Sequence, residues 1–128
     1  FIAAIEGLDQ LLTDVKSASE RGFICAIDQR KILVDSPHKA LNFLLQGSSA
    51  VLAKRWLTIT HDNITQLGIE ANQLAFIHDE LQYETHQNYA NDLSSSLVYS
   101  ATEAGEFYKL RVRIDAEAKV GNNWAEVH

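Results

Sequence analysis

Three titratable side chains stand next to one another in the middle of the chain, at His78, Asp79 and Glu80. They follow directly on four apolar residues, Leu74 to Ile77, a run that predicts a strand buried on both faces. Because an ionised carboxylate without a partner is costly to bury, acids at the end of such a strand indicate a cation nearby. A divalent metal ion is the cation that we expect there, and an ordinary solvated turn is the alternative.

The residues that follow the two acids predict a returning strand. Apolar and polar side chains alternate from Leu81 to Glu84, as they do along a strand with one exposed face. The stretch from Gln73 to Glu84 is therefore interpreted as a strand, a tight turn and a second strand. This arrangement puts the acidic pair at the tip of a hairpin.

A row of polar side chains lies on the helix predicted before this hairpin. Ser36 and Pro37 form a strong helix start, with serine as the N-cap and proline at the first helical position. His38, Asn42 and Gln46 then follow at intervals of four residues, which places three hydrogen-bonding side chains on one helix face. Such a row is usually a solvated face, and by itself it assigns no function.

These stretches resemble, in the same order, parts of the family A (Pol I-type) DNA polymerases. The sequence around His78-Asp79-Glu80 looks like motif C of that family, and Ser36 to Gly47 looks like the helix that precedes it. Residues 121–128 are similar to the end of the replicative polymerases of short-tailed phages. The resemblance covers nearly the whole chain, with residues 1–35 as the end of the fingers and residues 36–128 as the C-terminal part of the palm.

The resemblance implies template-directed transfer of deoxynucleotides to a primer 3′-hydroxyl, with two Mg²⁺ ions that share a carboxylate from outside these residues. Asp79 would be the metal ligand. Glu80 would support it, partly through water, because successive side chains of an extended segment point to opposite faces. His78 would contact the primer end, so the three residues together would form the catalytic site.

The same resemblance gives the polar row a role in binding DNA. His38, Asn42 and Gln46 would face the minor groove of the duplex, where every base pair offers an acceptor at nearly the same place. Amide donors there would test the geometry of a base pair and ignore its identity. Gly47 would be explained if a close neighbour needs the space of a side chain.

The implied partners are primer-template DNA, deoxynucleoside triphosphates and the rest of the polymerase chain, with any processivity factor binding outside this region. The chain begins with Phe1 and contains no methionine, which we interpret as a piece of a longer protein. Because the fingers helix and the first palm carboxylate of the family lie upstream, the 128 residues alone are expected to be catalytically inactive.

Two other functions remain open at this point. A non-catalytic truncated or decayed fragment would fold and act only as an interaction module. A metal-dependent hydrolase would use His61, His78, Asp79 and His86, although no two of these histidines have the spacing of a His-x-x-x-His motif. Tight Zn²⁺ binding would favour the hydrolase, and weak Mg²⁺ or Mn²⁺ binding lost in Asp79→Asn would favour the polymerase.

Charge and composition limit these interpretations. The chain is 46% hydrophobic, which is enough for one compact domain. No apolar run or leader predicts a membrane segment. We therefore expect a cytoplasmic protein, in the cytoplasm of the host cell if it is phage-encoded. The net charge is −6, and no Lys or Arg occurs between Arg55 and Lys109, where eight acids fall. A free-standing nucleic-acid binder would be basic. Other parts of a polymerase, or metal ions, would have to offset these acids.

Cys25 is expected to be a buried, inert thiol.

The remaining pattern predicts an α+β fold, with helices packed on a small antiparallel sheet and the acidic hairpin at its centre. The predicted elements are a helix over residues 1–21 ended by Gly22, a hairpin over 23–27 and 30–34, a helix from Pro37 with a break at 61–63 and an end at Gly68, a helix over 90–104 with a solvated Ser94–Ser96 face and an end at Gly105, a strand over 109–115 with a basic side, and an irregular tail anchored by Trp124.

Overall fold

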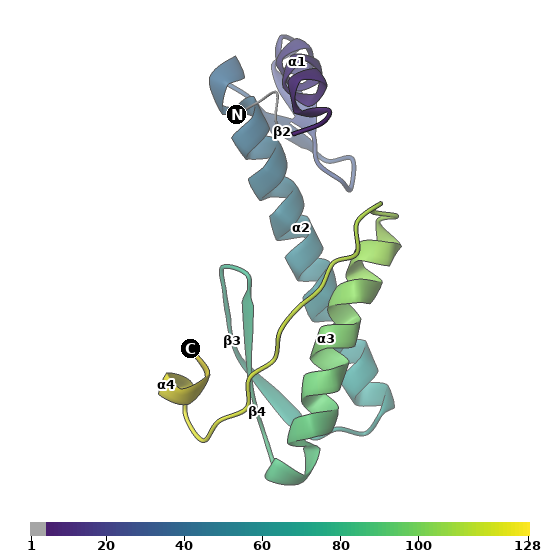
Figure 1. The fold of residues 1–128 in the computed structure, drawn as a ribbon, viewed down its shortest axis with the longest axis vertical. Helices are drawn as coiled ribbons and strands as arrows, with labels where there is room; N and C mark the ends of the chain where they lie inside the picture. The colour runs from purple at the N-terminus through teal and green to yellow at the C-terminus, as the bar shows by residue number, and fades with distance from the viewer. Residues whose placement is uncertain (1–4) are drawn as a thin grey trace. The chain divides into compact units, whose positions relative to one another are not determined.

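The structure, a computed structural model, describes residues 5–128. Its elements follow in the order α1 (Leu8–Ser19), β1 (Phe23–Cys25), β2 (Lys31–Leu33), α2 (Pro37–Gln66), β3 (Ala71–Ile77), β4 (Glu80–Thr85), the 3-10 helix η2 (Gln87–Tyr89), α3 (Ala90–Phe107) and α4 (Trp124–Val127) (Figure 1). β1 pairs with β2 and β3 with β4, both antiparallel. The predicted α+β class is confirmed, with two separate hairpins forming the sheets.

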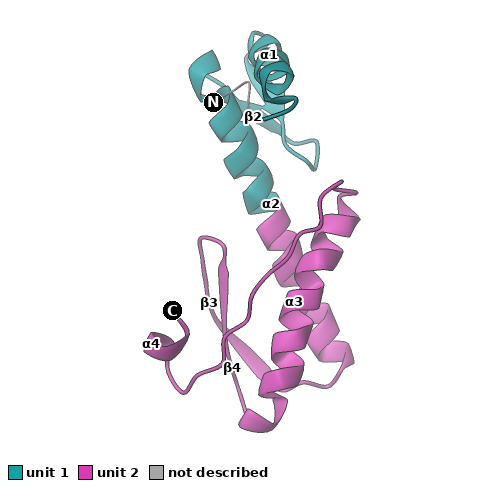
Figure 2. Ribbon diagram, viewed as in Figure 1, with its two compact units in different colours: residues 1–51 teal, residues 52–128 magenta. Residues whose placement is uncertain are grey.

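The chain divides into two compact units, residues 1–51 and 52–128 (Figure 2). Helix α2 contributes residues 37–51 to the first unit and residues 52–66 to the second. The division into fingers and palm between residues 35 and 36 concerns polymerase subdomains and stays a prediction. Within residues 5–128, no helix is both long enough and apolar enough to cross a lipid bilayer.

The first unit is built on a small core between α1, the β1–β2 hairpin and the start of α2. Val15, Ile24, Val34 and Ala40 form the buried centre of this core. Helix α1 ends at Ser19, and Gly22 follows with a φ of 81°, a left-handed conformation that glycine adopts without strain. The predicted first helix is confirmed over Leu8–Ser19, and the predicted hairpin over Phe23–Cys25 and Lys31–Leu33. Residues 5–7 are not helical, and residues 1–4 of the predicted helix lie outside the described residues.

The prediction of a buried thiol is wrong, because Cys25 is exposed. Side chains alternate between the faces of a strand. Ile24 and Ala26 point into the core, with 3% and 2% of their surface exposed, so Cys25 between them points outward.

Gly47 on α2 has a packing role. A Cβ placed there would collide with Cδ1 of Ile32, a partly buried β2 residue packed against the core of the first unit. The expectation that a close neighbour needs this space is confirmed. Leu45 of the same helix is exposed, so the apolar side chains near Gly47 are not all part of the core.

Helix α2 runs through residues 61–63 without the predicted break. The amide of Asn63 donates to Ser100 Oγ at 3.0 Å and to Glu103 Oε2 at 2.6 Å, so it does not compete for the backbone of its own helix. Gly68, with a φ of 67°, then ends the helix as predicted. Ile69 N–H donates to Ile64 C=O at 2.9 Å, the bond that closes a helix with a left-handed residue at its end.

In the second unit, α3 packs against residues 52–66 of α2. Trp56 Nε1 donates to the carbonyl of Leu97 at 2.8 Å, next to the bonds from Asn63. The side of α3 that faces this contact carries small residues, and Ser96 and Ser100 are buried. The expectation that Ser94–Ser96 form a solvated face is therefore wrong for Ser96.

Gly105 does not end α3, which continues to Phe107. The left-handed residue at this end is Lys109, with a φ of 53°, and Leu110 N–H donates to Gly105 C=O at 3.1 Å. Gly105 is buried, and a Cβ on it would lie 2.7 Å from Cγ1 of Ile114. Glycine is needed here for close packing and not for a cap.

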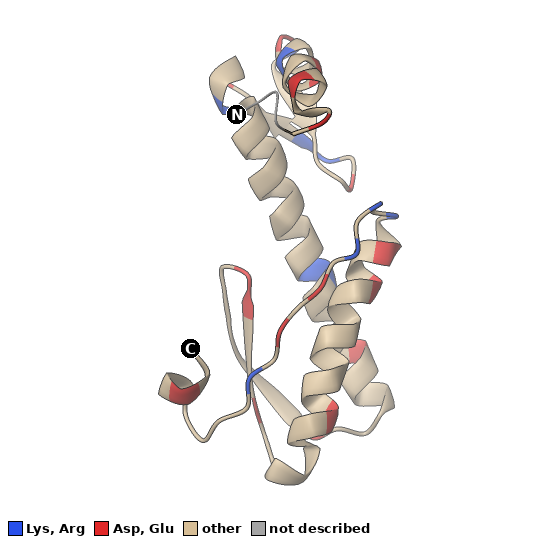
Figure 3. Cartoon of the chain, in the orientation of Figure 1, with Lys and Arg blue, Asp and Glu red and all other residues tan. Residues whose placement is uncertain are grey.

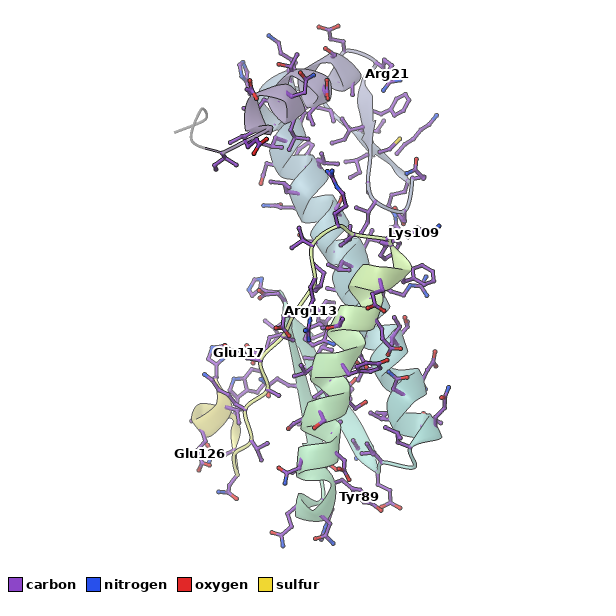
Figure 4. All side chains as sticks on the ribbon, turned by 45° about the vertical axis from the view of Figure 1, so that its right-hand side comes forward. Arg21, Tyr89, Lys109, Arg113, Glu117 and Glu126 are labelled. Atoms are coloured by element: carbon purple, nitrogen blue, oxygen red, sulfur yellow. The ribbon has the colours of Figure 1, made fainter. Side chains whose placement is uncertain are left out.

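No strand forms over residues 109–115, so this prediction is wrong. In the part of the chain that the structure describes, these residues pair with no strand, and without such a partner an alternating pattern cannot form a ladder. The segment is instead held by Thr102, whose Oγ1 donates to the carbonyl of Ile114 at 3.0 Å. Lys109 and Arg113 lie on irregular chain after the end of α3 (Figure 4).

Replacing Gly105 by alanine is expected to lower the free energy of unfolding by about 1 kcal/mol. Overpacking against Ile114 costs about 1–3 kcal/mol, and the better helix propensity of alanine returns about 1 kcal/mol. Urea denaturation followed by circular dichroism measures this change. In an Ile114→Ala background the space is free, so the same substitution should become neutral or stabilising. A stabilising effect in the unmodified chain would contradict the packing role.

Candidate active site

The three titratable residues lie at the tip of the β3–β4 hairpin, as predicted. Ile77 pairs with Glu80, which leaves His78 and Asp79 as the two residues of the turn. Figure 3 shows acidic residues at this tip, in the part of the hairpin farthest from η2. His78 and Asp79 are exposed, and Glu80 is partly exposed. The carboxylate of Asp79 is therefore open to a ligand.

The turn has two residues, the commonest length in a β-hairpin, and one of them has a left-handed backbone. His78 has a φ of 56°, a left-handed conformation that costs a non-glycine residue about 1–2 kcal/mol. Two-residue hairpin turns require such angles, and histidine is one of the residues that tolerate them best. Backbone strain of this kind is often found at functional sites.

The strand that leads to the tip is not buried on both faces, so this prediction is wrong. Leu74 and Ile77 are 58% and 41% exposed. Within the described residues the sheet has only two strands, and the apolar run has no layer on each side to cover it. Gln73 pairs with Tyr83 and Ala75 with Gln82, so Leu74 is an extra residue in a β-bulge.

The carboxylate of Glu80 already has two partners. Gln82 Nε2 donates to its Oε1, and His128 Nδ1 lies 3.3 Å from its Oε2. The sequence-based interpretation missed both. Gln82 could have been found, because residues two apart on a strand share a face. No local signal connects His128 with Glu80, since only tertiary folding brings the tail to the hairpin.

A small network of hydrogen bonds shapes the tail before His128. The carboxylate of Glu126 accepts from Asn122 N at 2.8 Å, from Asn122 Nδ2 at 3.2 Å and from Asn123 Nδ2 at 2.8 Å. Trp124, expected to anchor the tail, is 45% exposed and meets the ring of His128 edge-on at a centroid distance of 6.1 Å. Figure 4 shows Glu126 on α4. The polar network joins residues of the tail to one another, and the contact of His128 with Glu80 joins the tail to the hairpin.

Acid is expected to loosen this tail. The hydrogen bond from the backbone of Asn122 is the main cause that lowers the pKa of Glu126 below its ordinary value. A group with a lowered folded pKa contributes stability above its unfolded pKa, about 4.3, and loses it as the pH falls through the folded pKa. An NMR titration should show the Asn122 amide following the protonation of Glu126 below that value. In Glu126→Gln this acid transition should be absent, and its persistence would contradict the assignment.

The polar row of α2 lies in the first unit. His38, Asn42 and Gln46 are all exposed, and their spacing of four residues puts them on one face of a regular helix. Among the described residues, their side chains form no hydrogen bond with another protein group. Their contact with a duplex stays a prediction.

The donor set at the hairpin fits a hard divalent cation in part. Mg²⁺ takes oxygen ligands and is held by one or two protein carboxylates together with substrate phosphates. Asp79 offers a free carboxylate, with Glu80 next to it. Among residues 5–128, no three His, Cys, Asp or Glu side chains gather closely enough to hold a metal ion. His61, His78, Asp79 and His86 are therefore not brought together as a hydrolase site would require.

Comparison with known proteins finds a family that the sequence of this chain matches. The model of the family described as DNA polymerase family A matches residues 14–126. The DNA-directed DNA polymerase of Enterobacteria phage T3 is 34% identical over 119 residues, and that of Escherichia phage T7 is 32% identical over 119 residues. Each alignment covers 85% of this chain and 16% of the relative. The chain therefore spans a small part of the phage polymerases that it matches.

A solved structure gives the same fold. It is the POL domain of Pol1 from M. smegmatis in complex with DNA primer-template and dNTP, with a TM-score of 0.75 and 24% sequence identity. The match covers 85% of this chain and 21% of that chain. At 24% identity this similarity supports a shared fold and nothing further.

Proposed function

The chain belongs to DNA polymerase family A, and from this premise we propose that it is the C-terminal part of a DNA-directed DNA polymerase that transfers nucleotides to a primer 3′-hydroxyl. The observation that carries the proposal is the exposed Asp79 at the tip of a strained two-residue turn. Its neighbour Glu80 is already engaged by Gln82 and His128. This arrangement supports Asp79 as the metal ligand and Glu80 as a supporting group.

Each residue at the tip has a separate role in the proposed mechanism. Asp79 would hold the divalent cation, and Glu80 would hold water around it while Gln82 and His128 fix its carboxylate. His78, exposed at the first position of the turn, would contact the primer end. When bound, two Mg²⁺ ions supply charge stabilisation for the attacking and leaving oxygens. A further carboxylate, from outside these residues, would be shared by both ions.

The exposed polar row of α2 would bind the duplex. Asn42 and Gln46 would donate hydrogen bonds to the minor-groove acceptors that all base pairs share, and His38 would extend the row by one turn. Such contacts carry no sequence information. They would let one surface accept every correctly paired primer end, which a replicative enzyme requires.

The proposal also assigns partners. Residues 1–35 would be the end of the fingers and residues 36–128 the C-terminal part of the palm. The rest of the polymerase chain would supply the triphosphate-binding residues and most of the positive charge, because this chain has a net charge of −6. Primer-template DNA and deoxynucleoside triphosphates are the substrates, and any processivity factor binds elsewhere. The reaction would take place in the cytoplasm, which is that of the host cell if the protein is phage-encoded.

A primer-extension assay tests this function. A longer polymerase chain that includes these 128 residues should incorporate deoxynucleotides in the presence of Mg²⁺, and the 128 residues alone should incorporate none. Metal-dependent incorporation by the 128 residues alone would overturn the proposed inactivity. No incorporation by the longer chain, if folded, would favour a non-catalytic interaction module.

A further inference from the structure

The β1–β2 hairpin of the first unit has one face that its core does not use. Ile24 pairs with Ile32, and both side chains belong to the buried core. The other face carries the pairs Phe23 with Leu33 and Cys25 with Lys31. We call these four residues the outer face of the hairpin, and its Leu33 is 82% exposed.

Two cations converge on the aromatic ring of this outer face. Lys31 Nζ lies 4.5 Å from the centroid of the Phe23 ring, and Arg21 Cζ lies 5.5 Å from it. Arg21 is also oriented by a hydrogen bond from its Nε to the carbonyl of Ala18 at 3.4 Å. The ring and the two cations therefore form one positively charged group on the surface.

Neither of these cations is neutralised by a carboxylate. In the same unit Arg30 pairs with Asp28 at 2.6 Å and Lys39 with Asp35 at 3.0 Å. Arg21 and Lys31 form no ion pair with any of the residues that the structure describes. In a chain of net charge −6, this is a local site that can attract an anion.

We propose that the outer face of the β1–β2 hairpin binds single-stranded nucleic acid. That this strand is the unpaired template of a polymerase rests on the proposed function. Single strands are bound by aromatic side chains that stack on bases and by cations that hold the backbone phosphates. Phe23 and the exposed Leu33 supply the apolar surface, and Arg21 with Lys31 supplies the charge. A duplex would use only the cations, because its bases are already stacked on one another.

Cys25 provides a direct test in the unmodified chain. It is the only cysteine, it is exposed, and it stands opposite Lys31 on the outer face. A saturating thymidine oligonucleotide should slow maleimide modification of Cys25 several-fold, and a duplex of the same length should slow it much less. Both reactions run in EDTA, so the result does not depend on metal binding at Asp79.

Variants of the outer face test the roles of its residues. Fluorescence anisotropy measures the binding of a labelled single strand. Phe23→Leu should weaken this binding about tenfold. Lys31→Gln and Arg21→Gln should each reduce the slope of log affinity against log salt by about 0.7. Lys39→Gln, which removes a cation paired with Asp35, should change neither quantity appreciably. Circular dichroism must show that each variant is folded as the unmodified chain is.

Several outcomes would overturn the proposal. These are no measurable binding of the single strand at low salt, equal protection of Cys25 by the duplex, or the same loss in Lys39→Gln as in Lys31→Gln. None of them would affect the proposed role of Asp79, because that role is tested by metal binding and primer extension.

Discussion

Replacing Asp79 by asparagine is expected to lower kcat for primer extension about 10³-fold in a polymerase chain that contains these residues. Asparagine keeps the shape of the side chain and removes the charge that would hold a divalent cation. The loss corresponds to about 4 kcal/mol of transition-state stabilisation, which is the size of effect that a metal ion supplies at phosphoryl oxygens. Steady-state kinetics on a primer-template with saturating deoxynucleoside triphosphates measure it.

Two variants separate this effect from a general loss of negative charge. Asp62→Asn removes an exposed acid from α2 in the same unit and should leave kcat unchanged within a factor of two or so. Glu80→Gln should cost about 10–100-fold, as is usual for a group that supports a metal ligand. If Asp79→Asn and Asp62→Asn had equal effects, the assignment of the metal ligand would fail.

Metal binding tests the assignment of Asp79 as the metal ligand by a measurement that does not require polymerase activity. In the 128-residue chain, Mn²⁺ should broaden the NMR amide signals of residues 78–80 before those of other segments. Asp79→Asn should remove this selective broadening. Broadening that is unchanged in the variant would show that the cation is held elsewhere.

The sequence predicted the tip of the candidate site well, because the features that place it there are local. A run of apolar residues, two acids and an alternating return predict a hairpin, and the pairing of Ile77 with Glu80 confirms it. The spacing of Asn42 and Gln46 on a long helix is equally local. What a residue does within its own turn or strand can be inferred from its neighbours in the chain.

Features that depend on other elements were the ones missed. Leu74 to Ile77 look like a buried strand, and residues 109–115 look like a strand, but burial and pairing need a second layer or a neighbouring strand. Gly105 looks like a helix end and is instead the point where Ile114 packs on α3. The contact of His128 with Glu80 joins segments that are distant in sequence, so no spacing rule could predict it.

The tryptophans give a final prediction about what holds the second unit together. Trp56→Ala is expected to lower the free energy of unfolding of the second unit by about 3 kcal/mol. This value is at the lower end of the range for replacing a core tryptophan by alanine. The partly buried Trp56 ring lies between α2 and α3, and its Nε1 donates to Leu97 C=O. Urea denaturation followed by circular dichroism measures the change without relying on tryptophan fluorescence.

The chain carries its own matched control, because it has only two tryptophans. Trp124 is 45% exposed, and its ring nitrogen makes no hydrogen bond among the described residues, so Trp124→Ala should cost less than about 1 kcal/mol. Trp56→Phe, which keeps an aromatic ring and removes the donor, should cost about 1 kcal/mol. Equal losses at Trp56 and Trp124 would mean that the tail stabilises the fold as much as the α2–α3 contact does. The hairpin that carries Asp79 would then depend on its tail for stability.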